Sequence, residues 1–192
     1  MPVLMSNIGV AVGLTHNIGG SAPVGAVSGG LANTGTAILT HSRVAHNTVS
    51  SQTGFDLVRH FIGGVLNTGT LTLSASFITD NAVPEVLGTA IGGMTNTGGQ
   101  LSVTTTTIAA NTAVHSDSAI GGFYNASGTA TLTQSTIAAH RGSGLNGVGG
   151  IANGGTLTIR NSTIAGNTGN GDVRSGGILI GGIGFLPPPL VA

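Results

Sequence analysis

Polar and apolar residues alternate in five short segments of similar composition. They read TAILT, TLTLS, QLSVT, TATLT and TLTIR, at residues 36–40, 70–74, 100–104, 129–133 and 156–160. A period of two is typical of a strand with one buried face. The apolar positions are small or medium aliphatic residues, suited to a narrow core: Ala37, Leu39, Leu71, Leu73, Leu101, Val103, Ala130, Leu132, Leu157 and Ile159.

Each alternating segment sits within a longer repeat. Gly-Gly pairs begin at Gly29, Gly63, Gly92, Gly121, Gly149 and Gly176, at intervals of 27 to 34 residues. After each of the first five pairs comes an apolar residue, a variable residue and an Asn. After each strand come an apolar residue and, three residues later, an Asn or a His. A unit of this size cannot bury its apolar face alone, so the repeat predicts stacked coils in which each coil contacts its neighbours.

We therefore predict an all-β fold, a single-stranded right-handed parallel β-helix (β-solenoid) of about six coils of 27–34 residues. We expect one domain over 1–192, with a partial first coil at 1–28, five repeats at 29–175, and a partial last coil and tail at 176–192. A sandwich of short strands is the alternative, but it would not require nearly equal spacing five times. The Gly pairs allow positive φ or close approach of two backbones.

Polar corner residues in this fold can form hydrogen-bonded ladders between coils, which satisfy turn backbone that would otherwise be buried unpaired. Two such columns are predicted. The first holds Asn33, Asn67, Asn96, Asn125 and Asn153, and the second holds Asn47, Asn81, Asn111, His140 and Asn167.

The pattern GG-[LVMFI]-x-N followed by [IV]-x-x-[NH] resembles the right-handed parallel β-helix repeat of pectin-lyase-like proteins. Among these it is most similar to repeats of polymorphic outer-membrane proteins and autotransporter passengers. The resemblance runs from Gly29 to about Gly177, and the chain departs from it at His140, at Val44 and in one extra turn residue in the coils that start at Gly92 and Gly121. It implies an extracellular or cell-surface setting. We expect a non-enzymatic structural or adhesive role, with a glycan or a surface receptor as partner. Leu14 and Asn17 fit the second column, so we expect the chain to be part of a longer repeat protein.

Composition narrows the function classes. Charged residues make up 5% of the 192 residues and balance to a formal charge of zero, with Arg but no Lys. This gives no basic footprint for nucleic acid. There is no Cys, which removes disulfides and thiolate zinc sites. No apolar run is long enough for a membrane helix, so no membrane insertion is expected. The first residues show no recognisable signal peptide.

Most of the ionisable side chains fall in the variable connections between repeats. Equivalent insertions in a solenoid map to one side of the stack, so we expect a binding edge there. Its candidate residues are Asp56, Arg59, His60, Glu85, His115, Asp117, Arg141, Asp172 and Arg174. The alternative is that these loops are simply exposed and polar.

A carbohydrate-active β-helix, either a polysaccharide lyase or a glycoside hydrolase, is a further alternative. Its candidate catalytic residues are Asp56, Arg59, His60, Asp80 and Glu85. The resemblance implies that lyases of this fold combine acidic Ca²⁺ ligands with a basic residue, and hydrolysis needs two carboxylates at a defined separation. No Lys and no clustered carboxylates are present, and the six His residues match no standard metal spacing. We therefore expect no cofactor and no metal, with Ca²⁺ only under the lyase alternative.

Thr dominates the outward face of the alternating segments. One column reads Thr36, Thr70, Gln100, Thr129, Thr156, and the next reads Ile38, Thr72, Ser102, Thr131, Thr158. Such a face resembles that of ice-binding solenoids, which is a remote alternative. It could also bind glycans through hydroxyl hydrogen bonds, and Thr is in any case a common exposed strand residue.

Overall fold

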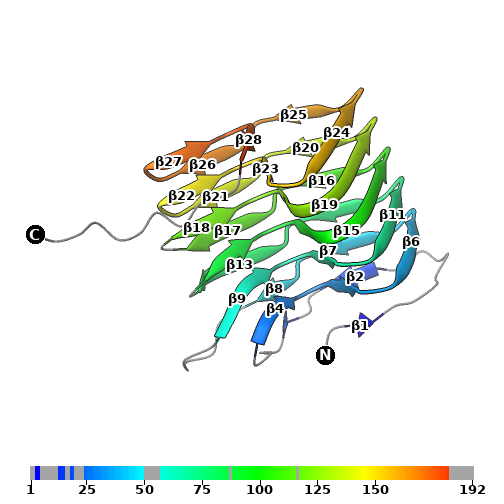
Figure 1. Ribbon diagram of the computed structural model, residues 1–192, viewed down its shortest axis with the longest axis horizontal. Coiled ribbons are helices and arrows are strands. Elements are labelled where there is room, and N and C mark those ends of the chain that lie inside the picture. Colours follow the sequence, from blue (N-terminus) through cyan, green and yellow to red (C-terminus); the bar gives the residue numbers. More distant parts are fainter. Residues whose placement is uncertain are drawn as a thin grey trace, which may run out of the picture.

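The protein folds as an all-β parallel solenoid in which strands from successive coils stack into long sheets (Figure 1). Every strand pair is parallel, as predicted, and the described residues contain no helix. The count of complete coils is slightly lower than the six predicted, because the described strands at each end form only part of a coil. The computed structural model describes residues 3–4, 13–15, 18–19, 24–49, 57–86, 88–115 and 117–181.

The first sheet has ten strands and supplies two segments to most coils. The segment after a Gly pair comes from β5 (Leu31–Asn33), β10 (Val65–Asn67), β23 (Ile151–Asn153) and β28 (Ile178–Ile180), and β1 (Val3–Leu4) pairs with β5 at the end of this row. The alternating segment comes from β6 (Thr36–Thr40), β11 (Thr70–Ser74) and β24 (Thr156–Arg160). Two long strands contain both segments: β15 (Met94–Thr104) and β19 (Phe123–Thr133).

Three further sheets of six strands complete each coil. The second sheet holds β2 (Gly13–Thr15), β7 (Arg43–Ala45), β12 (Phe77–Thr79), β16 (Thr107–Ala109), β20 (Thr136–Ala138) and β25 (Thr163–Ala165). The third holds β3 (Ile18–Gly19), β8 (Thr48–Val49), β13 (Ala82–Val86), β17 (Thr112–His115), β21 (Arg141–Ser143) and β26 (Thr168–Asn170). The fourth holds β4 (Val24–Ser28), β9 (Leu57–Ile62), β14 (Thr89–Ile91), β18 (Ser118–Ile120), β22 (Asn146–Val148) and β27 (Val173–Ser175).

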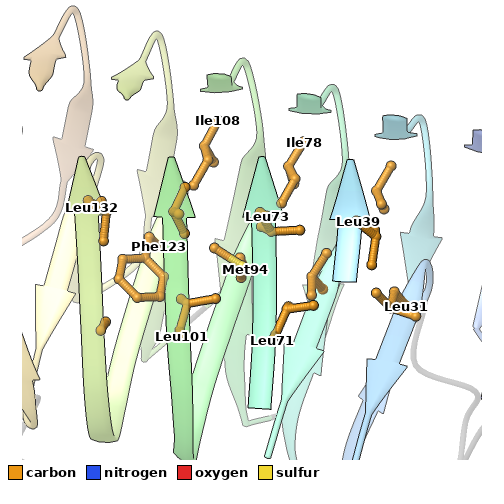
Figure 2. Close-up of a cluster of buried hydrophobic side chains, with 14 of the residues drawn as sticks. Leu31, Leu39, Leu71, Leu73, Ile78, Met94, Leu101, Ile108, Phe123 and Leu132 are labelled. Carbon is orange, nitrogen blue, oxygen red and sulfur yellow. The ribbon is translucent and has the colours of Figure 1, made fainter. Parts of the chain in front are cut away.

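The core is a column of aliphatic side chains that point inward from the first and second sheets. Leu71 and Leu73 of β11 are fully buried and lie in register with Leu101 and Val103 of β15. Ile78 and Ile108 close the core from the second sheet (Figure 2). The predicted inward positions are therefore confirmed. Leu157 and Ile159 are only partly buried, because no described strand lies beyond β24.

The Gly-Gly pairs are explained by close approach of neighbouring coils. A Cβ on Gly63 would lie 2.6 Å from the carbonyl oxygen of Gly92, and one on Gly92 would lie 2.7 Å from that of Gly121. Neither residue is among those with positive φ. The sequence allows two explanations for these Gly residues, positive φ and close approach of two backbones. Close approach, which leaves no room for a side chain, is the one that applies.

Positive φ occurs instead at two other corners, mostly in residues other than Gly. One corner column is His41, Ala75, Thr105, Gln134 and Asn161, and the other is His46, Asp80, Ala110, Ala139 and Gly166, with φ between 47° and 65°. The left-handed region is unfavourable for residues with a Cβ. These corners therefore hold local strain that the stacking of the coils must outweigh.

No segment of the described chain forms a helix that could cross a membrane.

Candidate functional site

The described turns of the variable connections stack at one edge of the solenoid, whereas much of the connections forms strands of the third and fourth sheets. These turns join the third sheet to the fourth, so that β13, β18, β22 and β27 lie together at the left of Figure 1. Asp117 and Asp172 are exposed in two of these turns, and Arg174 is exposed in the following strand β27. Arg141 is also exposed, but it begins β21, one sheet earlier in the coil. Both signs of charge thus lie open to solvent near this edge.

The candidate catalytic residues are distributed over different elements. His60 is half-buried in β9, where it is in register with Thr89, whereas Asp80 is exposed at the corner between β12 and β13. The backbones of Arg59 and Glu85 lie in β9 and β13. Asp56 lies outside the described residues. Within the described part of the chain, no three His, Asp or Glu side chains gather as metal ligands would.

Asp80 is paired with an Arg from the preceding coil. The carboxylate lies 3.7 Å from the Arg43 guanidinium, and both side chains are largely exposed, at 41% and 52%. The guanidinium also lies 3.4 Å from Nε2 of His46. An exposed ion pair of this kind contributes roughly 0–1 kcal/mol to stability. This arrangement is that of an ordinary surface ion pair.

His115 is not part of an exposed binding edge, and its assignment there is wrong. The alternation of β17 places it on the same inward face as Ala113, and its side chain is only 3% exposed. Nδ1 accepts hydrogen bonds from the backbone N–H groups of Asp117 at 2.7 Å and Ser118 at 3.2 Å. His115 therefore stabilises the turn from inside the coil. In the sequence, the period-two alternation of TAVH indicates this inward position.

The first Asn column forms the predicted ladder. Each Nδ2 donates to the Oδ1 of the Asn one coil further on, at 2.8 Å from Asn33 to Asn67 and from Asn67 to Asn96, 2.9 Å from Asn96 to Asn125 and 2.7 Å from Asn125 to Asn153. The same amides also donate to turn carbonyls, such as those of Gly69 and Gln100. The column joins every coil from β5 to β23.

The second column combines Asn and His. Asn47 donates to Asn81, and Asn81 to Asn111, both at 2.9 Å. At the next coil, Nδ1 of His140 accepts the backbone N–H of Asn111 at 3.0 Å, and Nε2–H donates to the carbonyl of Ile108 at 3.0 Å. Burial lowers the pKa of His140 to about 4. With both ring nitrogens engaged inside the coil, His140 is a structural residue.

A third column, of hydroxyl side chains, was missed in the sequence. The backbone N–H of Ser42, Ser76, Thr106 and Ser135 each donates to the hydroxyl oxygen of the equivalent residue one coil on, at 3.0 to 3.3 Å. Each hydroxyl in turn donates to the carbonyl two residues before it. Its signal is a Ser or Thr two residues before the apolar position of the second sheet, in every repeat from Ser42 to Ser162.

A groove of about 540 Å³ lies on the outer face of β11, β15 and β19. These strands are at the right of Figure 1, across the solenoid from the turns that carry Asp117 and Asp172. The groove is open to solvent and its floor is formed at Leu71 and Leu101. Its polar walls come from two of the outward columns: Thr70, Gln100 and Thr129, and Thr72, Ser102 and Thr131.

The groove side chains differ from the hydroxyls at the corners. No hydrogen bond joins the side chains of these six residues to another described residue, whereas Ser76, Thr106 and Ser135 are bonded both within and between coils. No charged residue lines the groove. The outer face thus offers uncharged donors and acceptors to solvent.

No protein-family model, curated protein or solved structure matches this chain.

Proposed function

We propose that this chain is a non-enzymatic structural and adhesive segment of a secreted or cell-surface protein. The observation that supports this role most strongly is the column of buried amides from Asn33 to Asn153, bonded from coil to coil. A buried amide whose partners belong to neighbouring coils fixes their spacing, since any slip would leave polar groups unpaired. The result is a stiff scaffold that holds its surface side chains at constant positions.

Contact with a partner would come from the edge that carries the variable turns. Asp117, Asp172 and Arg174 are exposed there, and the connections at this edge differ in sequence from coil to coil. Rigid scaffolds that present variable loops are a common arrangement for binding surfaces. A glycan or a surface receptor is the partner that this role implies. The resemblance to pectin-lyase-like and autotransporter passenger repeats supports the extracellular setting.

Carbohydrate cleavage is the second candidate function, and the geometry favours it less. Glycosidic cleavage by two carboxylates needs them on either side of one bond. Asp80 is instead engaged with Arg43 at a corner, and His60 lies on a different sheet.

A panel of polysaccharides incubated with the full chain, with and without Ca²⁺, tests the proposal. The expected result is that no polysaccharide gives new reducing ends or unsaturated products, while intact cells are retained on the immobilised protein. Asp117→Ala/Asp172→Ala should weaken the retention of cells, whereas the exposed strand variant Thr163→Ala, on the second sheet, should not. Turnover of any polysaccharide would overturn the non-enzymatic role.

A further inference from the structure

The hydroxyl-lined groove on β11, β15 and β19 lies on a different face from the loop edge, so it calls for its own explanation. Its six polar side chains come from three successive coils and two positions per strand: Thr70, Thr72, Gln100, Ser102, Thr129 and Thr131. Adjacent strands are about 4.8 Å apart and alternate residues of a strand about 7 Å apart. The groove therefore presents a regular grid of hydrogen-bonding groups that is elongated along the solenoid.

We propose that this groove binds a neutral polysaccharide chain lying along the stacking direction of the coils. The proposal goes beyond the loop-edge binding described above and does not depend on it.

The chemistry of the walls identifies the ligand class. Hydroxyl groups both donate and accept, as do the hydroxyls of sugars, and the amide of Gln100 adds two donors and an acceptor. An apolar partner would displace water from these groups without offering hydrogen bonds in its place, which is unfavourable. A polyanion would find no cation among the lining residues. A neutral chain with repeated hydroxyls satisfies the grid at several coils.

Gln100 is the residue that we expect to determine specificity. Its column is Thr36, Thr70, Thr129 and Thr156 in the other coils, and the register places Gln100 directly between Thr70 and Thr129. It is exposed, and its side chain is longer than that of its neighbours. The regular hydroxyl face is therefore interrupted at the middle of the groove by a single amide, which can distinguish one pattern of sugar hydroxyls from another.

Affinity chromatography of the full chain on immobilised polysaccharides tests the proposal. The columns would carry neutral polysaccharides (a glucan, a mannan and a galactomannan) or polygalacturonate as an acidic comparison. The expected result is retardation by at least one neutral polymer that is unchanged when salt rises from roughly 0.1 M to 1 M, because surface charge contributes nothing to it. Retardation by polygalacturonate alone, or lost at high salt, would overturn the proposal.

Two groups of variants locate the site. Thr72→Val/Thr131→Val keeps side-chain shape and strand preference but removes two hydroxyls, and should weaken binding roughly tenfold. Gln100→Ala should lower the affinity roughly threefold to tenfold. Ser102→Phe should block the groove. Thr107→Val/Thr136→Val, on the outer face of the second sheet, is the matched control and should bind as the unaltered chain does. A thermal melt of each variant establishes that it is folded.

Three outcomes would overturn the groove as the binding site. The first is equal retardation of the folded groove variants and the control. The second is loss of binding in Asp117→Ala/Asp172→Ala alone, which would leave the loop edge as the binding surface. The third is thermal hysteresis that depends on Thr72 and Thr131 with no retardation by any polysaccharide, which would assign the face to ice.

Discussion

The backbone N–H of Asn111 donates to Nδ1 of His140 at 3.0 Å, at a position where the other coils supply an Asn side chain. In the preceding coils, the N–H of Asn81 donates to Oδ1 of Asn111 at 2.9 Å, and the Nδ2 of Asn111 donates to the Ile78 carbonyl at 2.9 Å. His140 reproduces both bonds with its two ring nitrogens. Unlike an amide, however, it can take up a proton.

The unfolding free energy should therefore fall as the pH is lowered from about 6.5 to about 4. Burial lowers the pKa of His140 to about 4, so in that range the unfolded chain binds a proton that the folded chain does not. The loss approaches about 3 kcal/mol below pH 4. It is absent above the pKa of the unfolded state, where both states are neutral.

His140→Asn should remove this pH dependence while keeping both hydrogen bonds. Denaturant unfolding of the two proteins at pH 7.5, 6 and 5 measures the difference, and the comparison cancels contributions from the other titrating groups. Parallel stability curves for the variant and the unaltered protein would contradict the assigned role of His140.

Asn96→Ala should lower the unfolding free energy by about 3 kcal/mol. The change removes two side-chain bonds of the first column, to Asn67 at 2.8 Å and to Asn125 at 2.9 Å, and leaves buried polar groups unsatisfied. Gln100→Ala on the same strand is exposed and should change stability by no more than about 0.5 kcal/mol. Guanidinium unfolding measures both. Equal effects of the two substitutions would show that the column does not hold the coils together.

Gly92→Ala should destabilise the fold by about 2 kcal/mol or prevent folding. The new Cβ would lie 2.7 Å from the backbone of both Gly121 and Thr112, neither of which can move without shifting a coil. At Gly35, by contrast, nothing lies within 4 Å of the place that a methyl group would occupy, and Gly35→Ala should be tolerated. Thermal melts of the pair test the explanation of the Gly-Gly motif. Tolerance of alanine at Gly92 would contradict it.

Ala139→Gly should stabilise the protein by about 0.5–1 kcal/mol. Ala139 has φ +57°, and the equivalent position of the next coil is already Gly166, with φ +65°. Relief of the left-handed strain outweighs the greater entropy that Gly adds to the unfolded chain. Ala138→Gly in the adjacent strand β20 relieves no such strain and should destabilise. A lower melting temperature for Ala139→Gly would show that the corner is not strained.

Much of the fold could be predicted from the sequence because two simple properties repeat. The alternation in TLTLS indicates which side chains point inward, and an Asn at a fixed distance from each Gly pair indicates a corner that recurs in every coil. Leu71 and Leu73 in the core and Asn67 in the ladder follow from these two properties alone.

The rest depends on distances that a sequence does not contain. The steric reason for Gly63 is the 2.6 Å approach of another coil, and the groove beside Thr72 depends on how three strands lie against one another. The column headed by Ser42 recurs in every repeat of the sequence, but its role follows only from the backbone N–H groups that donate to its hydroxyl oxygens. His115 directly precedes a loop in the sequence, which favours an exposed position, but the alternation of its own strand directs it inward.

The central claim is that the interior columns hold the coils together while the uncharged outer face of β11, β15 and β19 binds a neutral polysaccharide, apart from any partner at the loop edge. Titration of the isotope-labelled full chain with a neutral oligosaccharide, followed by nuclear magnetic resonance, tests it most directly. We predict shifts in the side-chain amide of Gln100 and the backbone amides of Thr72 and Thr131, with none at Asp117 or Asp172. Shifts confined to Asp117 and Asp172, or no shifts with any neutral oligosaccharide, would contradict the claim.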